Sequence, residues 1–251
     1  MPIHDFNAQR LFVDHDLSAG CRIECPSAQV NYLINVLRLK PGDPIFVFNG
    51  RDGEWRCLVC DVAKRRCVLE AETCVRPQEL NQTLHYFFAP LKKGRLDYMV
   101  QKAVELGVSH LHPVLTQRTV ADRVKLDRMR ANAIEAAEQC GILSLPNILE
   151  PIKFGPLIDS WQEELPLVFC DELARVENPI EALKTVPPGP LGVFVGPEGG
   201  FSTDERQRLL DAPFAHPISL GPRIMRADTA AIAALTIVNT VLGDWRSKSD
   251  C

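Results

Sequence analysis

The sequence predicts an α/β protein in which a small β-rich domain precedes a larger domain built on a mostly parallel sheet. Residues 1–76 contain several short segments of strand-type composition and one helix-type segment. From residue 84 onward, strand-type and helix-type segments alternate, which is the order that builds a parallel sheet. Residues 77–83 lack apolar periodicity and are expected to form a linker. The expected domains are therefore residues 1–76 and 84–251.

The first domain is predicted from short β-type runs bounded by turn signals. Asn49-Gly50 and Asp52-Gly53 are turn dipeptides between two such runs, which indicates a hairpin. One helix is expected over Ser27–Leu37, with Ser27 as its N-cap and apolar residues on one face. The domain has the size of a barrel-like module. Its expected strands are Arg10–Val13, Cys21–Ile23, Asp43–Phe48, Glu54–Val62 and Arg66–Thr73.

The second domain contains one helix of unusual composition. Residues Asp228–Leu242 are apolar nearly all round, which predicts burial on more than one side. We therefore expect this helix to pack on the sheet and on a partner subunit, which would give a homodimer. Other helices are expected over Leu96–Leu106, with Gly107 as a C-cap, over Leu126–Cys140, and from Thr203. The expected strands are Leu84–Leu91, His110–Val114, Pro166–Cys170, Leu191–Val195 and Ile218–Leu220.

Composition places the chain among globular proteins with a core. Hydrophobic residues make up 46% of the 251 residues, and the apolar run Ala230–Leu242 is too short and too polar to span a bilayer. No secretory signal is seen at Met1–Asp5, so we expect a cytoplasmic protein. Cys57 and Cys60 have zinc-ligand spacing, but a strand would point them to opposite sides. We expect no metal, and we expect the nine cysteines to be free thiols.

The charge distribution is uneven along the chain. The net charge is −4, but residues 92–130 contain nine lysines and arginines against four acidic residues. A basic segment inside an acidic chain is a candidate contact surface for phosphate. The alternative is a solvated face of charged helices.

Gly196–Ser202 forms a glycine-rich loop between a predicted strand and a predicted helix. Such a loop can present backbone N–H groups to a ligand. It lacks both the Gly-Lys-Ser/Thr of a P-loop and the dinucleotide glycine spacing. Pro197 and Glu198 disfavour a pyrophosphate, because a carboxylate repels it, and they suit an adenosine that carries a sulfonium. A tight turn that needs two glycines is the structural alternative.

Leu220–Arg226 is a second loop, between a predicted strand and the last helix. Gly221-Pro222 bends the chain, and Arg223 and Arg226 follow at a three-residue spacing. Asp228 and Thr229 are candidate caps for the helix, and an Arg226–Asp228 ion pair is the structural alternative. Arginines beside a glycine turn at a strand end lie where α/β proteins place ligand contacts. We find no Ser/His/Asp or Cys/His catalytic set in the sequence.

Four motifs occur together in a fixed order and resemble one family. They are Gln101–Val108, Glu135–Cys140, Gly196–Ser202 and Leu220–Ala230. With Val36–Arg38 and Lys40–Asp43 in the first domain, they resemble the ribosomal small-subunit methyltransferase E family, over nearly the whole chain. The resemblance implies a PUA-like RNA-binding domain before a SPOUT domain whose C-terminal part forms a trefoil knot. It further implies a dimer that methylates N3 of a uridine in 16S ribosomal RNA, in the small ribosomal subunit or its precursor, with S-adenosyl-L-methionine.

The resemblance places the cofactor among three loops, and the charges of these loops and of the basic segment indicate further roles. Arg226, then Arg223, are the candidates for stabilising charge on the uridine, and Glu198 is a candidate base. RNA contacts are expected from Arg10, Arg38, Lys92, Lys93 and Arg95. Cofactor contacts are expected from Phe169, Cys170, Val195, Gly196, Pro197, Glu198, Gly199, Gly200, Ser219, Leu220, Gly221, Ile224, Met225, Thr229 and Ala230.

Two departures from the family pattern bear on substrate contacts. Asp228 stands where the family usually has Glu, and Gly141 is followed by Ile142 rather than by Arg. Three alternatives remain open. One is another SPOUT RNA methyltransferase, a second is a non-catalytic RNA-binding protein, and a third is a dinucleotide-type enzyme, against which the missing glycine spacing argues.

Overall fold

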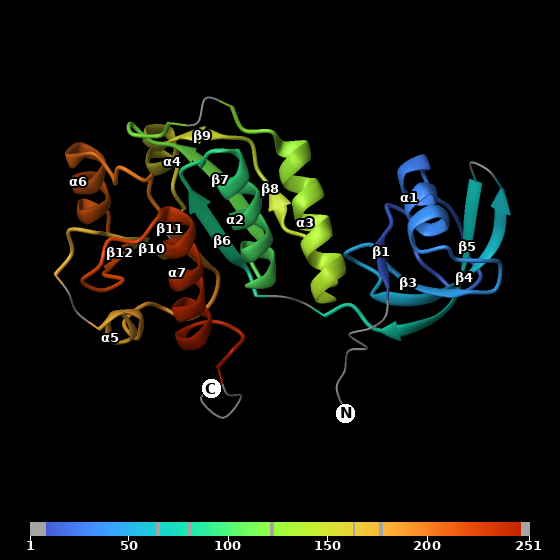
Figure 1. Ribbon diagram of the computed structural model, residues 1–251. Coiled ribbons are helices and arrows are strands. Elements are labelled where there is room, and N and C mark those ends of the chain that lie inside the picture. The colour runs from blue at the N-terminus through green and yellow to red at the C-terminus, as the bar shows by residue number, and fades with distance from the viewer. Residues whose placement is uncertain are drawn as a thin grey trace. The chain divides into compact units, whose positions relative to one another are not determined.

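A computed structural model describes residues 9–63, 66–79, 82–120, 123–162, 164–175 and 178–246. The chain divides into two compact units, which Figure 1 shows as ribbons. The first unit combines residues 1–80 with residues 134–145, and the second combines 81–133 with 146–251. The division after residue 80 falls in the expected linker 77–83, of which residues 80 and 81 lie outside the described ranges. The return of residues 134–145 to the first unit differs from the contiguous division expected from the sequence.

The first unit is a five-stranded sheet in the order β1-β3-β4-β5-β2. β1 and β3 pair in parallel, and the remaining pairs are antiparallel. The expected helix is shorter: α1 (Ser27–Asn31) passes into a π-helical turn, η1 (Tyr32–Val36). Pro26, not Ser27, is the N-cap, and no side chain caps this helix. The strands are β1 (Arg10–Phe12), β2 (Arg22–Glu24), β3 (Pro44–Phe48), β4 (Glu54–Ala63) and β5 (Arg66–Arg76).

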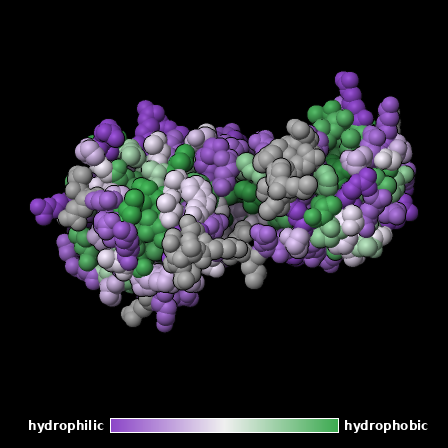
Figure 2. Space-filling model, turned by 90° about the horizontal axis from the view of Figure 1, so that it is seen from below, coloured by the Kyte–Doolittle hydropathy of each residue, from purple (hydrophilic) through white to green (hydrophobic). Residues whose placement is uncertain are grey.

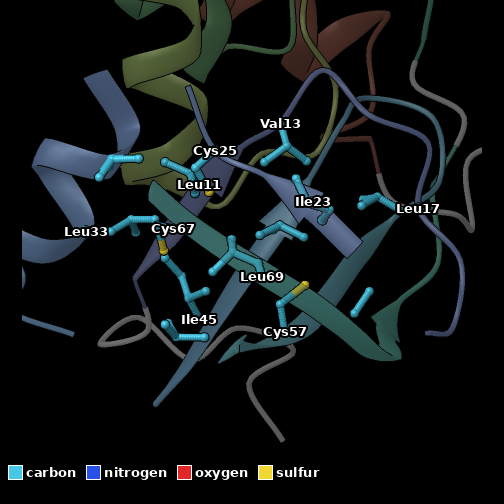
Figure 3. Close-up of a cluster of buried hydrophobic side chains, with 14 residues drawn as sticks. Leu11, Val13, Leu17, Ile23, Cys25, Leu33, Ile45, Cys57, Cys67 and Leu69 are labelled. Carbon is cyan, nitrogen blue, oxygen red and sulfur yellow. The ribbon is translucent and has the colours of Figure 1, made fainter. Parts of the chain in front are cut away.

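Alternating apolar residues of these strands form the core of the first unit, which includes three cysteines (Figure 3). Burial raises the pKa of the Cys25 and Cys57 thiols to about 12, so these groups stay protonated and pack as small hydrophobes. Cys57 is buried and Cys60 is exposed, so the two lie on opposite sides of β4. Within the described ranges, no group of three or more His, Cys, Asp or Glu side chains could hold a metal ion.

Residues 134–145 complete the first unit through polar contacts. α3 (Leu126–Cys140) ends in this segment, and its Glu138 Oε1 accepts a hydrogen bond from the Phe12 N–H at 2.8 Å. Arg76 Nη2 donates to the Gly141 carbonyl oxygen at 2.9 Å. The same Arg76 and Arg10 both bond to Glu54, each at 2.7 Å. Glu138 of α3 therefore satisfies a backbone N–H of β1, and Arg76 of β5 satisfies the carbonyl oxygen of Gly141, just after α3.

The second unit contains a parallel sheet in the order β12-β10-β11-β6-β7-β8, with β9 also pairing with β7. The strands β10, β11 and β12 are neighbours, so the loops that follow them meet at one edge of the sheet. The strands are β6 (Leu84–Phe88), β7 (His110–Leu115), β8 (Asn147–Ile148), β9 (Ile152–Lys153), β10 (Leu167–Cys170), β11 (Leu191–Val195) and β12 (Ala215–Ile218). The helices are α2 (Lys93–Glu105), α4 (Phe154–Asp159), α5 (Pro179–Leu183), α6 (Thr203–Asp211) and α7 (Ala227–Val241).

Both faces of this sheet are covered, which explains the continuous apolar runs of its strands. On one face, Phe87, Phe169 and Phe194 pack in a core cluster with residues of α4 and α6. On the other face, the fully buried Tyr86 contacts Met99 of α2 through its hydroxyl. All five residues of β11 are buried, as expected for a central strand.

α7 begins one residue earlier than expected and packs against α2 and β11. Its N-cap is Arg226, whose side chain makes no capping bond, so neither Asp228 nor Thr229 is the N-cap residue. The Asp228 carboxylate instead accepts the N–H of the next residue at 2.9 Å. Ile232 and Ile237 of α7 remain partly exposed, whereas Ala234, Leu235 and Val238 are buried.

The surface mixes polar and apolar residues. On the face drawn in Figure 2, hydrophobic residues gather in patches that are bordered by hydrophilic ones. No helix in the described part of the chain is both long enough and apolar enough to cross a membrane.

Candidate active site

The loops after β10, β11 and β12 line one pocket at the carboxyl edge of the sheet. They contribute residues 170–172, 195–198 and 219–225, and the first turns of α7 close the pocket with Ala227 and Ala230. The pocket therefore has an apolar wall of valine, leucine, methionine and alanine, with carboxylates and one arginine around it. A site of this kind can hold an aromatic base on the wall and a charged group at the rim.

Most residues expected to contact a cofactor line this pocket, whereas four do not. Phe169 points into the core cluster of the sheet, and Thr229 is exposed on α7. Gly199 and Gly200 shape the loop instead of lining the pocket. The expected residues that line it are Cys170, Val195, Gly196, Pro197, Glu198, Ser219, Leu220, Gly221, Ile224, Met225 and Ala230.

The glycine loop after β11 is held at its middle and at its C-terminal end. Ser202 and Glu205 form a reciprocal capping box at the start of α6, with bonds of 3.3 and 3.0 Å. Glu205 also accepts the Gln117 N–H at 2.7 Å, and Arg118 Nη1 donates to the Gly199 carbonyl oxygen at 2.7 Å. These contacts fasten the loop to the segment that follows β7 and fix its conformation before any ligand binds.

Glycine is favoured at position 200 by its backbone conformation, and the Glu172 side chain lies close against it. The φ of Gly200 is +67°, in the left-handed region that favours glycine, and an added Cβ would collide with the Glu172 carboxylate. The turn thus brings Glu172, from the loop after β10, directly against the glycine loop.

Three carboxylates border the pocket, and two of them were not expected from the sequence. Asp171 is 3% exposed and receives three hydrogen bonds of 2.8–3.0 Å from Arg206 of α6. Burial, with Asp171 as a second cause, raises the pKa of Glu172. The third is Glu198. Asp171 and Glu172 lie directly after the strand Leu167–Cys170. This position is the sequence signal that could have found them, since strand ends in parallel sheets carry ligand contacts.

The two arginines of the second loop differ in placement. Arg223 lines the pocket, whereas Arg226 is exposed at the start of α7 and is not among the lining residues. No ion pair joins Arg226 to Asp228 within the described ranges, so the structural alternative for this arginine is wrong. Ile224 between them is 98% exposed at the pocket rim.

Of the five residues expected to contact RNA, one is buried and the others lie at the surface. Arg10 is buried and bonded to Glu54, so its guanidinium is not on the surface, and its expected RNA contact is dropped. Arg38 is exposed, and its φ of +57° makes it the one non-glycine residue with positive φ within the described ranges. Lys92 and Lys93 are exposed at the start of α2, and Arg95 pairs with Glu198.

The class of protein that the fold and the matching family models define is an RNA methyltransferase with a PUA-like domain before it. A family model described as an RNA methyltransferase domain matches residues 78–239, and one described as an RNA methyltransferase PUA domain matches residues 26–72. The chain belongs to the ribosomal RNA small subunit methyltransferase E family. The trefoil knot that the resemblance implies stays a prediction.

Relatives and solved structures span nearly the whole chain. The Rickettsia conorii member is 30% identical over 91% of this chain and 94% of its own length. The Synechocystis sp. member is 33% identical over 94% of this chain and 78% of its own length. The crystal structure of the Neisseria gonorrhoeae member, bound to S-adenosyl methionine, has a TM-score of 0.84 at 27% identity, covering 96% of this chain and 100% of that one.

Proposed function

We propose that this protein transfers a methyl group from S-adenosyl-L-methionine to N3 of a uridine in 16S ribosomal RNA, within the small ribosomal subunit or its precursor. The observation that carries the proposal is the pocket of three loops, with its apolar wall and its carboxylate rim. The names of the relatives and the bound molecule of the Neisseria structure support it.

The residues present fit this cofactor better than they fit a nucleotide polyphosphate. Val195, Leu220 and Met225 offer an apolar surface to an adenine ring. Glu172 and Glu198 place negative charge beside the pocket, which attracts a sulfonium and an ammonium group and repels phosphates. When bound, the cofactor supplies an electrophilic methyl group on sulfur.

The chain must then orient the uridine and remove its N3 proton. The new N–C bond forms as the methyl–sulfur bond breaks, and the N3 proton passes to a base, for which Glu198 is the candidate. Arg223, at the pocket, would stabilise negative charge on the flanking carbonyl oxygens, because such charge grows as the proton leaves. Arg226 is exposed one residue before α7 and can assist from the same loop if its side chain turns inward.

The exposed residues Arg38, Lys92 and Lys93 would hold the RNA backbone. The partly exposed apolar residues of α7 support a homodimer through this helix. A protein with this substrate works in the cytoplasm.

The test is to map methylation in ribosomal RNA from a strain that lacks the gene. A methyl group on N3 blocks the pairing edge of uridine, so reverse transcriptase stops at that position. We expect one stop in 16S RNA to disappear in the deletion strain and to return with the intact gene but not with Arg223→Ala. A stop pattern that is unchanged by the deletion would contradict the proposal.

Binding of the cofactor in the absence of RNA distinguishes a methyltransferase from a non-catalytic RNA-binding protein. We expect S-adenosyl-L-methionine to raise the melting temperature, since a ligand that binds only the folded state stabilises it. RNA binding without any shift would favour the non-catalytic role.

A further inference from the structure

A second cavity lies in the second unit, between the first turn of α2 and the start of α3. These two helices lie side by side in Figure 1, and Arg128 of α3 bonds to Asp97 of α2. We call this cavity the basic cleft. Its lining residues are Leu91, Lys92, Lys93, Leu96, Asp97, Val120, Arg123, Lys125, Arg128 and Met129.

Among the residues that the structure describes, the lining of the basic cleft carries more positive charges than carboxylates. Its one carboxylate, Asp97, is occupied: Arg128 Nε donates to it at 2.6 Å, and Asn132 Nδ2 donates at 2.8 Å. Within the described ranges, no acidic side chain pairs with the other cations of the cleft, and all of them are exposed. These four cations are Lys92, Lys93, Arg123 and Lys125. Phosphate groups are the natural counter-charge for such a cluster.

The cleft also has an apolar wall, which a simple phosphate site does not need. Leu91, Leu96 and Met129 are buried around it, and Val120 is 68% exposed beside them. Cations that flank an apolar surface match a nucleotide whose base is unstacked from its neighbours. A paired base would be hidden inside a duplex, so this match favours single-stranded RNA.

The first turn of α2 connects the basic cleft to the candidate active site. Lys92 and Lys93 line the cleft, whereas Arg95, on the same turn, pairs with Glu198 of the cofactor pocket. One RNA strand that crosses this turn can therefore reach both places.

We propose that the basic cleft binds an unpaired nucleotide next to the target nucleotide, with its base on the apolar wall and its phosphates on the lysines. This inference rests on the proposed function, because it takes the substrate to be RNA. It assigns binding roles to Val120, Arg123 and Lys125, which the sequence motifs did not indicate.

The test measures binding without catalysis. The probes are a 5′-labelled oligouridylate of eight nucleotides and the same chain of abasic ribose phosphates, followed by fluorescence anisotropy. We expect the wild-type protein to bind the uridine probe about tenfold more tightly, because only that probe has bases to place on the wall. Lys125→Ala should weaken both probes and lower the salt slope by about 0.7, the value for one lost phosphate contact on a single strand. Val120→Ser should weaken the uridine probe alone.

The matched control is Lys184→Ala, which removes an exposed cation of α5 that pairs with Glu181. We expect this variant to bind both probes as the wild type does. Equal wild-type affinity for the two probes would overturn the base contact, and equal losses in Lys184→Ala and Lys125→Ala would overturn the site. Ribosomal methylation is scored separately. If the wild-type protein methylates RNA but the cleft variants bind both probes normally, only the proposed role of the basic cleft is contradicted. If the wild-type protein does not methylate RNA, the proposed function is contradicted.

Discussion

Arg95 and Glu198 form an ion pair that ties the first turn of α2 to the glycine loop of the candidate active site. The pair joins a residue expected to contact RNA to one expected to contact the cofactor. Both side chains are partly exposed, so the pair adds little to stability. Its effect lies in the charge that each partner presents to a ligand.

Replacing Arg95 by alanine should move cofactor and RNA affinity in opposite directions. The Glu198 carboxylate would lose its counter-charge and attract a cationic ligand more strongly, whereas the RNA would lose a phosphate contact. We expect S-adenosyl-L-methionine to bind a few-fold more tightly by calorimetry and RNA to bind more weakly. Lys93→Ala, as the control, should weaken RNA binding alone. Weaker cofactor binding in Arg95→Ala would contradict this account of the pair.

Arg206→Ala should destabilise the second unit much more than a neighbouring arginine variant. It leaves the buried Asp171 carboxylate without its three hydrogen bonds from Arg206, so that among the described residues only the Leu173 N–H still donates to it, which costs about 3 kcal/mol of unfolding free energy. Arg208→Ala, on the same helix, removes an exposed pair with Asp159 and should cost less than about 1 kcal/mol. Urea unfolding measures both. Equal losses would show that Asp171 finds another partner.

Acid should destabilise the second unit through a cluster of histidines. His85 Nδ1 lies 2.9 Å from His112 Nε2, and His110 stacks on His85 at a ring distance of 4.2 Å. Burial, with the neighbouring histidines as a second cause, lowers the pKa of His85 from 6.5 to about 4 and that of His112 to about 3. Burial also lowers the pKa of His110.

The sign follows from proton binding. Above pH 6.5 the histidines are neutral in both states, and below it the unfolded chain binds protons that the folded chain does not. Stability should therefore fall from pH 6.5 to about pH 4, by up to about 1.4 kcal/mol per pH unit for each histidine. His112→Gln should flatten this dependence in urea titrations at several pH values. An identical slope would exclude His112 as a source.

Gly200→Ala should impair cofactor binding, while another glycine variant should not. The alanine would be strained at φ +67°, which costs about 1–2 kcal/mol, and it would push the Glu172 carboxylate from its place beside the pocket. Gly94→Ala, in α2, meets no atom within 4 Å and should stabilise the helix slightly. Calorimetric affinity for S-adenosyl-L-methionine compares the two. An unchanged affinity in Gly200→Ala would mean that the loop adapts freely.

The sequence predicted the continuously apolar strands of the second unit better than the mixed ones, because a strand covered on both faces carries an apolar run. β8 and β9 were not expected, and β12 is Ala215–Ile218 where Ile218–Leu220 was expected. β11 has the expected bounds, Leu191–Val195. The local sequence did not predict the placement of side chains that depends on residues distant in the chain. Arg10 has the positive charge of an RNA-binding residue, but its ion pair with Glu54, 44 residues away in the sequence, holds it in the interior. Asp171 and Glu172 carry no motif, and only the packing of three strand ends brings them to the pocket.

The assignment of residues 134–145 to the first unit sets the order in which the chain can complete its fold during synthesis. The β-rich unit is encoded first, yet the Glu138 side chain that satisfies the Phe12 N–H emerges from the ribosome more than a hundred residues later. The first 80 residues can therefore make these contacts only after residues 81–133 of the second unit have been made. A gene fragment that stops at the linker therefore lacks residues 134–145 of the first unit, and an exchange of that unit between relatives would need three crossovers, after residues 80, 133 and 145.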